Sequence, residues 1–263
     1  MAMPNNLLLV RHGESEGNPI LKALHENRRP PDAEILDKVD TSLWRLTALG
    51  VRQARTTGAW LRDQPWARFD LYLCSDYVRA RETAAELNLP DAKWRVEFYL
   101  RERDRGRESA LLTKEELERR FPGSREQKAR HAFYWRPEDG ESIADLCQRV
   151  NRVLDTLWRD NDSHNVIVVC HEEVMWAFRM RLEKLAPEDY LKLDQDEALK
   201  VHNCQVWHYT RLDPETGRQA VHFTHRATYD PVEPRRSRWE PIHRPRYSNK
   251  DLLKGLPPRT LKS

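Results

Sequence analysis

The sequence lacks the closely spaced cysteines of a disulfide framework or a zinc ribbon. Only four cysteines occur in 263 residues, and no two of them form a C-x-x-C pair. Two of them end apolar runs, where a free thiol behaves as a small hydrophobic side chain. We therefore expect free thiols and a reducing, cytoplasmic compartment. The cysteines are Cys74, Cys147, Cys170 and Cys204.

Long apolar runs and a strong excess of charge are also missing. No run approaches the roughly 18 residues of a membrane helix, and the opening MAMPNN has no basic segment followed by an apolar one, as a secretion signal would. The 45 basic and 42 acidic residues leave a net charge of only +3. This balance favours neither nucleic acid nor a membrane as a partner.

The sequence does have the composition of a globular protein with ample core, since 39% of its residues are hydrophobic and 33% are charged. Residues 6–18 read NLLLVRHGESEGN, a short apolar run that ends in Arg11, His12 and Gly13. Such a run is typical of a buried parallel strand, and open α/β sheets bind ligands at the carboxyl ends of their strands. A guanidinium beside an imidazole, with glycines that let backbone N–H groups approach, predicts an anion site, most simply for phosphate.

A second apolar run, VIVVC, presents His171 at its end as the first run presents His12. Between and around these runs, helical and strand patterns alternate. We predict strands at 71–74 and 94–99, helices at 46–63 and 140–160 capped by Thr47 and Ser142, and a hairpin within 200–226. Residues 19–45 read as a loop with a helical turn. The two histidines at equivalent strand ends predict one shared site.

The string RHGESEGN resembles the signature of the histidine phosphatase (phosphoglycerate mutase-like) superfamily. The element after the strand at 71–74 is similar to the family's Ser-x-x-x-Arg-Ala-x-x-Thr-Ala stretch, with Ser75 and Arg79 in place. The resemblance implies a three-layer α/β/α sandwich with a mostly parallel central sheet. It also implies a catalytic domain, which we place at 1–227, with an insertion at 107–139 over the site. The resemblance does not reach residues 228–263, whose many prolines and arginines predict a tail that is either laid on the surface or disordered.

The resemblance further implies a reaction that needs no metal or other cofactor. The motif histidine takes up a phosphoryl group, a glutamate donates and accepts the proton, and cationic or neutral donors hold the phosphoryl oxygens. On this sequence these are His12 as nucleophile, Glu102 as acid and base, Arg11, Arg79 and a protonated His171 as clamps, and Asn18 as a neutral donor.

Plainer explanations exist for several of these residues. Arg79 could pair with a glutamate on its own helix, and Glu102 could be a surface ion-pair partner. The arginines around Glu102 should also favour its ionised form, which does not suit a general acid. Histidines 202, 208, 222 and 225 suggest a metal site, but polar positions with period two on a hairpin give the same pattern.

Two departures from the family pattern bear on function. Glu172 and Glu173 follow His171 where relatives usually have glycine, and two carboxylates would repel an anion unless they begin the next helix and point away. Arg105 stands where mutases have a tyrosine. We expect a phosphomonoesterase acting on a small phosphate ester, with a phosphoglycerate mutase or a catalytically weakened phosphate-ester-binding protein as alternatives. A homodimer is a further possibility.

Overall fold

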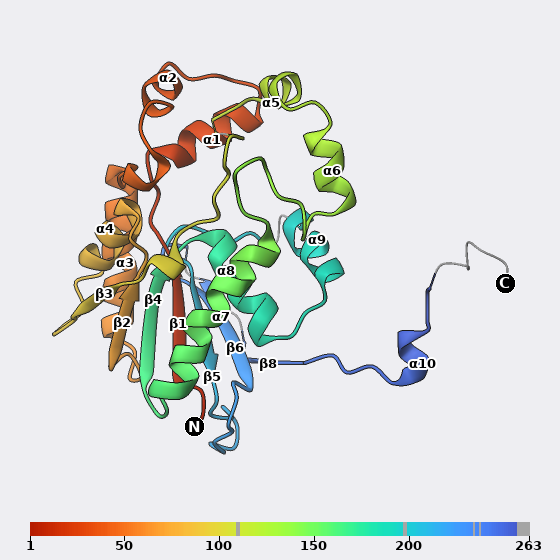
Figure 1. The fold of residues 1–263 in the computed structure, drawn as a ribbon. Helices are drawn as coiled ribbons and strands as arrows, with labels where there is room; N and C mark the ends of the chain where they lie inside the picture. The colour runs from red at the N-terminus through yellow and green to blue at the C-terminus, as the bar shows by residue number, and fades with distance from the viewer. Residues whose placement is uncertain (109–110, 197–198, 234, 237, 257–263) are drawn as a thin grey trace, which may run out of the picture.

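The structure, a computed structural model, describes residues 1–108, 111–196, 199–233, 235–236 and 238–256. Within these residues, eight strands form one sheet in the order β3-β2-β4-β1-β5-β6-β7, with β8 also paired to β6 (Figure 1). The first four of these strands are parallel, and the rest pair antiparallel. The strands are β1 (Asn6–Arg11), β2 (Leu71–Cys74), β3 (Trp94–Val96), β4 (Asn165–Cys170), β5 (Val206–Thr210), β6 (His225–Asp230), β7 (Arg235–Arg236) and β8 (Glu240–Pro241).

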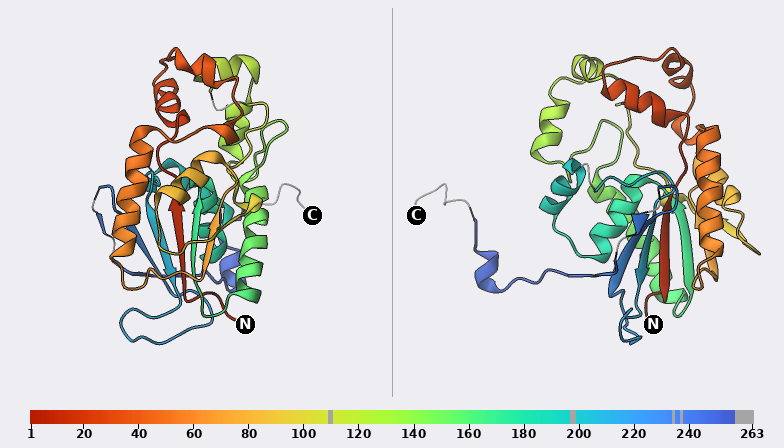
Figure 2. Two further views of the ribbon diagram at one scale, coloured as in Figure 1. Left: turned by 90° about the vertical axis from the view of Figure 1, so that its left-hand side faces the viewer. Right: turned by 180° about the vertical axis from the view of Figure 1, so that it is seen from behind.

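Helices cover both faces of the sheet (Figure 2). Alternate residues of β1 point to opposite faces: Leu7 and Leu9 pack with α7 (Ile143–Asp160) and α8 (Glu172–Leu182), whereas Leu8 and Val10 pack with α3 (Ala48–Arg62) and α4 (Val78–Glu86). All four side chains are fully buried. Burial on both faces explains why β1 is a continuous apolar run. The predicted three-layer α/β/α sandwich is confirmed.

The predicted helix starts are also confirmed. The Thr47 hydroxyl accepts a hydrogen bond from the Gly50 N–H at 3.0 Å at the start of α3, and Ser142 forms a capping box with Asp145 at the start of α7. The strand predicted over 94–99 is shorter, because the Glu97 side chain accepts a hydrogen bond from the backbone of Tyr99. This turns the chain into the 3-10 helix η2 (Phe98–Leu100).

Two segments form a cap over the carboxyl ends of the parallel strands (Figure 1). The first is more helical than predicted: 19–45 was expected to be mainly loop, but α1 (Gly17–His25), α2 (Asp32–Leu36) and η1 (Thr41–Leu43) occupy much of it. The second segment, within the predicted insertion at 107–139, contains α5 (Lys114–Arg120) and α6 (Ser124–Arg130). The helices of the first segment form because they share an apolar cluster with the second: Ile20, Leu24, Ala33, Leu36, Trp44 and Leu111.

The sheet continues beyond residue 227, where we placed the end of the catalytic domain. That boundary falls inside β6, because Ala227 and Tyr229 are buried against the same side of the sheet as α3. The β7 and β8 strands then extend the sheet within the segment expected to be a surface tail. Arg244 still donates to the carbonyls of Leu182 and Phe223, and after it the chain leaves the body, so that α10 (Asn249–Leu252) stands apart (Figures 1 and 2).

All four cysteines are free and buried. Among the described residues, no helix combines the length and the apolar character needed to cross a membrane. The remaining helix, α9 (Pro187–Gln195), begins with proline at its first position and lies beside the cap (Figure 1).

A glycine sets the distance between α3 and α4. A Cβ atom at Gly58 would lie 2.0 Å from the carbonyl oxygen of Leu87, and a backbone atom cannot rotate away. We therefore expect Gly58→Ala to lower the free energy of unfolding by about 1–3 kcal/mol despite the better helix propensity of alanine. Urea denaturation measures it. The exposed Thr56→Ala on the same helix should be nearly neutral, and equal stability of both variants would contradict this account.

Candidate active site

The parallel pairing of β1 with β4 brings two histidines together. Arg11 lies opposite Cys170 in the ladder, so the residues that follow, His12 and His171, leave the sheet side by side. The His12 N–H donates to the carbonyl of Cys170 at 3.0 Å. The imidazole ring centroids are 5.1 Å apart, and both side chains are buried. The sequence predicted this meeting of two strand ends.

Hydrogen bonds define which nitrogen of His12 is free to react. Nδ1 lies 2.7 Å from the carbonyl oxygen of Gly13, which can only accept, so Nδ1 carries the proton. Nε2 is then unprotonated and accepts a hydrogen bond from Nε of Arg79 at 3.2 Å. Burial, followed by the charges of Arg79 and Arg11, holds the pKa of His12 well below its usual value. The ring is therefore neutral over a wide pH range, as a nitrogen nucleophile must be.

Arg79 lies in the first turn of α4 and is buried. Its Nη1 donates to the carbonyl of Thr41 at 2.6 Å, and its guanidinium lies 4.7 Å from the ring centre of Tyr77. The glutamates of α4 do not hold it, since Glu82 pairs with Arg45 and Glu86 with Arg55. The guanidinium therefore faces the histidines rather than forming the surface pair that the sequence also allowed.

His171 accepts or donates one hydrogen bond, between Nε2 and the Ser75 hydroxyl at 2.9 Å. Its buried Nδ1 has no hydrogen-bond partner among the residues that the structure describes. Burial, then the positive charge of Arg79, lowers the pKa of His171 well below its usual value. The His171 ring is therefore neutral in the ligand-free site, and its protonated form with a phosphoryl group bound stays a prediction. A bound phosphoryl dianion would favour its protonation.

Arg11 and Glu172 form an ion pair at the edge of the site. Nη2 of Arg11 lies 3.0 Å from Oε2 of Glu172, and Nη1 donates to the carbonyl of Val201. Nε of Arg11 is buried without a hydrogen-bond partner among the described residues. Glu172 begins α8, as expected, but its carboxylate does not point away from the site, because it pairs with Arg11. The first acidic departure from the family pattern thus binds a clamp arginine.

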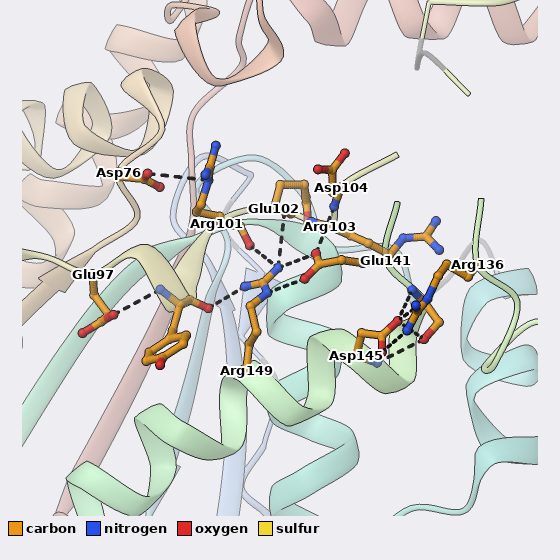
Figure 3. A network of polar contacts seen from close by, with 12 residues as sticks. Asp76, Glu97, Arg101, Glu102, Arg103, Asp104, Arg136, Glu141, Asp145 and Arg149 are labelled. Carbon is orange, nitrogen blue, oxygen red and sulfur yellow. Dashed lines mark hydrogen bonds and ion pairs between the residues drawn. The ribbon is translucent and has the colours of Figure 1, made fainter. Parts of the chain in front are cut away.

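Glu102 lies in the loop after η2, which is held from below by Arg149 of α7 (Figure 3). The Arg149 guanidinium donates to the carbonyls of Tyr99 at 2.6 Å and Arg101 at 3.1 Å, and binds both carboxylate oxygens of Glu141 at 2.7 and 2.8 Å. Oε1 of Glu102 accepts a hydrogen bond from the Arg103 N–H at 2.9 Å. These contacts fix the backbone that carries Glu102.

Glu102 is not made more acidic by the arginines around it, contrary to our expectation. Burial and the negative charge of Glu173 raise the pKa of Glu102 to about 7, while Arg79 and Arg105 only partly oppose the shift. The nearby arginines are engaged elsewhere: Arg103 and Arg105 pair with Glu173, and Arg101 with Asp76. A carboxyl that keeps its proton near neutral pH suits a general acid.

Asn18 has a different contact from the one predicted. Its carboxamide oxygen accepts hydrogen bonds from the backbone and hydroxyl of Ser15, at 2.8 and 3.1 Å, at the start of α1. Its role as a phosphate ligand stays a prediction. Thr83 holds the loop that follows β1. Its hydroxyl accepts a hydrogen bond from the Gly13 N–H at 3.0 Å and donates one to the carbonyl of Arg79 at 2.7 Å.

Sequence reasoning missed some supporting residues. Tyr77 packs edge-on against the His171 ring at 5.1 Å and beneath the Arg79 guanidinium, but a lone aromatic residue before a helix gave no signal. Ser75 and Thr83 were present in the motif without a role. Arg149 lies within the helix predicted at 140–160, but nothing local shows that an arginine inside a helix supports a distant loop.

The hairpin histidines occupy unrelated places. His208 is buried, bonds to Asn6 and packs against Trp66, while His202 pairs with Asp230. His222 stacks on Trp158. In the described part of the chain, no group of three or more histidine, cysteine, aspartate or glutamate side chains could hold a metal ion.

Comparisons with known proteins agree with this geometry. A family model described as "Histidine phosphatase superfamily (branch 1)" matches residues 7–219. The chain belongs to the histidine phosphatase superfamily. Within it, a 2,3-bisphosphoglycerate-dependent phosphoglycerate mutase of Nitrobacter hamburgensis is 33% identical over 195 residues, which cover 71% of this chain and 84% of the relative.

Other members of the superfamily are also similar. The phosphoglycerate mutase-like protein AT74 of Arabidopsis thaliana is 32% identical over 205 residues, 72% of this chain but only 60% of that protein's length. Among solved structures, the alpha-ribazole phosphatase of Shigella flexneri superposes with a TM-score of 0.60 at 21% identity, covering 82% of this chain and 95% of that one. At that identity the likeness shows the fold.

Two arginine variants test the assignment of the anion site, one of them as the control for the other. Arg79 points to the histidines, whereas Arg81, two residues on, is exposed. Arg79→Ala should weaken the binding of inorganic phosphate at least about tenfold, since hydrogen bonds to charged groups contribute about 1.5–3 kcal/mol. Arg81→Ala should leave binding unchanged. Isothermal titration calorimetry measures both, and equal binding by the two variants would contradict the assignment of the anion site.

Proposed function

We propose that this member of the histidine phosphatase superfamily is a metal-independent phosphomonoester hydrolase that forms a phosphohistidine on His12 and acts on a small phosphorylated metabolite. The observation that carries the proposal is the state of His12. Its Nε2 is unprotonated, hydrogen-bonded to Arg79 at 3.2 Å, and beside a second buried histidine. A neutral nucleophile among fixed positive charges is what transfer of an anionic phosphoryl group requires.

In the first half-reaction, Nε2 of His12 attacks phosphorus and the bond from phosphorus to the ester oxygen breaks. Arg79 would exchange its hydrogen bond to His12 for one to a phosphoryl oxygen, and the unpartnered Nδ1 of His171 and Nε of Arg11 offer further contacts. The departing oxygen takes the proton of Glu102. The phosphoryl group is then bonded to His12, and the alcohol leaves.

In the second half-reaction, water attacks the phosphohistidine. The Glu102 carboxylate, now without its proton, accepts one from the water as the new oxygen bonds to phosphorus. The bond from Nε2 to phosphorus breaks, inorganic phosphate leaves, and Glu102 is protonated again. One carboxyl with a pKa of about 7 can serve in both steps at neutral pH.

Positive charge in the cap supports an anionic substrate. His25, at the end of α1, has its pKa lowered by partial burial and then by Lys200, Lys114, Arg105 and Lys128, which places these cations around one region beside the site. They come from the cap helices α5 and α6 and from two loops. A metabolite with a second anionic group would be attracted to this side of the site.

A phosphoglycerate mutase-type activity is the second candidate, favoured by relatives about one-third identical that bear this name. Such an enzyme would keep the same phosphohistidine but return the phosphoryl group to the bound product. Arg105 in place of the tyrosine of the mutases argues for hydrolysis. A protein that binds phosphate esters without turning them over is the third, and the two glutamates after His171 are the feature that suggests it.

His12→Ala tests the proposal directly. We expect p-nitrophenyl phosphate hydrolysis that persists in EDTA, that falls at least about 10³-fold in His12→Ala, and that is unchanged in the exposed His243→Ala. Acid-labile ³²P on the native protein, absent from His12→Ala, identifies the intermediate. Exchange only between phosphoglycerate isomers would favour the mutase, and phosphate-ester binding without turnover would favour the binding protein.

The pKa of Glu102 predicts a pH profile and a leaving-group dependence. Because the acid must be protonated, kcat/KM should fall as the pH rises above about 7, and this alkaline limb should be missing in Glu102→Gln. The same variant should lose at least about 10²-fold with glycerol 3-phosphate. It should lose less with p-nitrophenyl phosphate, whose leaving group departs without a proton.

The surface variant Glu86→Gln is the matched control for Glu102→Gln, since Glu86 pairs with Arg55 outside the site. It should keep both the alkaline limb and the rates of the native protein. An equal loss of rate on the two esters in Glu102→Gln would rule out the acid role of Glu102.

A further inference from the structure

Glu173, the second acidic departure from the family pattern, binds two arginines that follow Glu102 in the chain. Oε2 of Glu173 lies 3.1 Å from Nε of Arg103, and Oε1 lies 3.1 Å from Nη2 of the same guanidinium. Arg105 adds a third contact, with its Nη2 3.3 Å from Oε2. The Arg103 side chain is 1% exposed and that of Glu173 14%, so the pair is shielded from solvent.

These contacts direct positive charge away from Glu102. Arg103 follows Glu102 directly, and the hydrogen bond that it donates to the Glu102 carboxylate comes from its backbone N–H. Its guanidinium points away from the Glu102 side chain (Figure 3). Without a carboxylate on α8, a buried guanidinium so close in the chain would have Glu102 as its nearest available anion.

We propose that Glu173 is a positioning residue for the acid step: by binding Arg103 and Arg105, it keeps their guanidinium groups from pairing with Glu102, so that Glu102 holds its proton for the leaving group. The inference rests on the proposed function, because a proton on Glu102 matters only if a leaving group takes it. It also explains how this chain tolerates a glutamate after the second site histidine.

The charges around Glu102 agree with this role. Glu173 acts on it from α8 with negative charge, and burial acts in the same direction. Opposing them are Arg79 from α4 and Arg105 from the same loop. Tyr77, Arg103 and Cys170 also interact electrostatically with Glu102. Arg149 donates to the backbone carbonyl of Glu102.

The ionisation of Glu173 itself is secured by its neighbours. Burial alone would raise its pKa, but Arg105, Arg103 and Lys128 together hold the pKa of Glu173 well below its usual value. Glu173 is therefore charged across the working range of the site, and it keeps binding the arginines while Glu102 gains and loses its proton.

The titration of Glu102 in Glu173→Gln tests the proposal, because a purely structural role of Glu173 would leave that titration unchanged. The titration midpoint of the Glu102 carboxyl can be followed by ¹³C NMR of labelled glutamate, assigned by its loss in Glu102→Gln. We expect Glu173→Gln to lower this midpoint by about one pH unit or more, because a negative neighbour is lost and two cations are released. The alkaline limb of kcat/KM should move to lower pH by the same amount.

Three further variants complete the test. Glu173→Asp, which keeps the carboxylate, should retain most of the native midpoint, and Glu172→Gln, which changes the adjacent acid bound to Arg11, should leave it unchanged. If Glu173→Gln does not fold, Arg103→Met/Glu173→Gln removes both buried charges. The Glu102 midpoint of this double variant should still lie below the native value, because the negative charge of Glu173 is lost and Arg105 is released.

The outcomes separate the inference from the proposed function. An unchanged Glu102 midpoint in Glu173→Gln, or in the double variant where only that one folds, would overturn the role of Glu173 even if the native protein hydrolyses phosphate esters. A lowered midpoint in a protein without phosphatase activity would support the role of Glu173 and refute the hydrolase.

Discussion

The parallel pairing of β1 with β4 is the interaction on which the site depends. It places His12 and His171 side by side, because each follows the last paired residue of its strand. The adjacent β2 ends in the loop that carries Ser75 and leads into α4 with Arg79. Three neighbouring strands thus deliver the reacting groups to one edge of the sheet. Burial of both faces of β1 fixes its register, since a slip by one residue would exchange the two apolar sets that pack under different helices.

The arginines at this edge of the sheet each have a defined partner. Arg79 contacts Thr41 and Tyr77 and faces His12, while Arg11 pairs with Glu172. Arg103 and Arg105, which would otherwise favour the ionised form of Glu102, are bound to Glu173. The two carboxylates that seemed out of place beside an anion site therefore each hold an arginine in a defined position. The effect of such a carboxylate on the anion site depends on the partner that it binds. Its charge alone does not show which partner that is.

The sheet and the histidine pair could be predicted because both depend on local patterns. Apolar runs mark β1 and β4, and the residue after each run must lie at the strand end. The cap could be predicted only in part: 19–45 has two adjacent prolines and mixed charge, and its helices are stabilised by Trp44 and by Leu111 from a distant segment. The pKa of Glu102 could not be predicted either. It depends on which carboxylate the nearby arginines bind, and that pairing joins residues 70 positions apart.

The cap has a small apolar cluster of its own, separate from the two clusters that enclose the sheet. Its residues come from two stretches of chain that meet above the strand ends. Mutations that repack the cap cluster can therefore accumulate without disturbing the two apolar clusters that pack against the sheet and its histidine-bearing strands. An architecture of this kind allows the cap to diverge among related proteins while the arrangement of the two histidines at the strand ends stays the same.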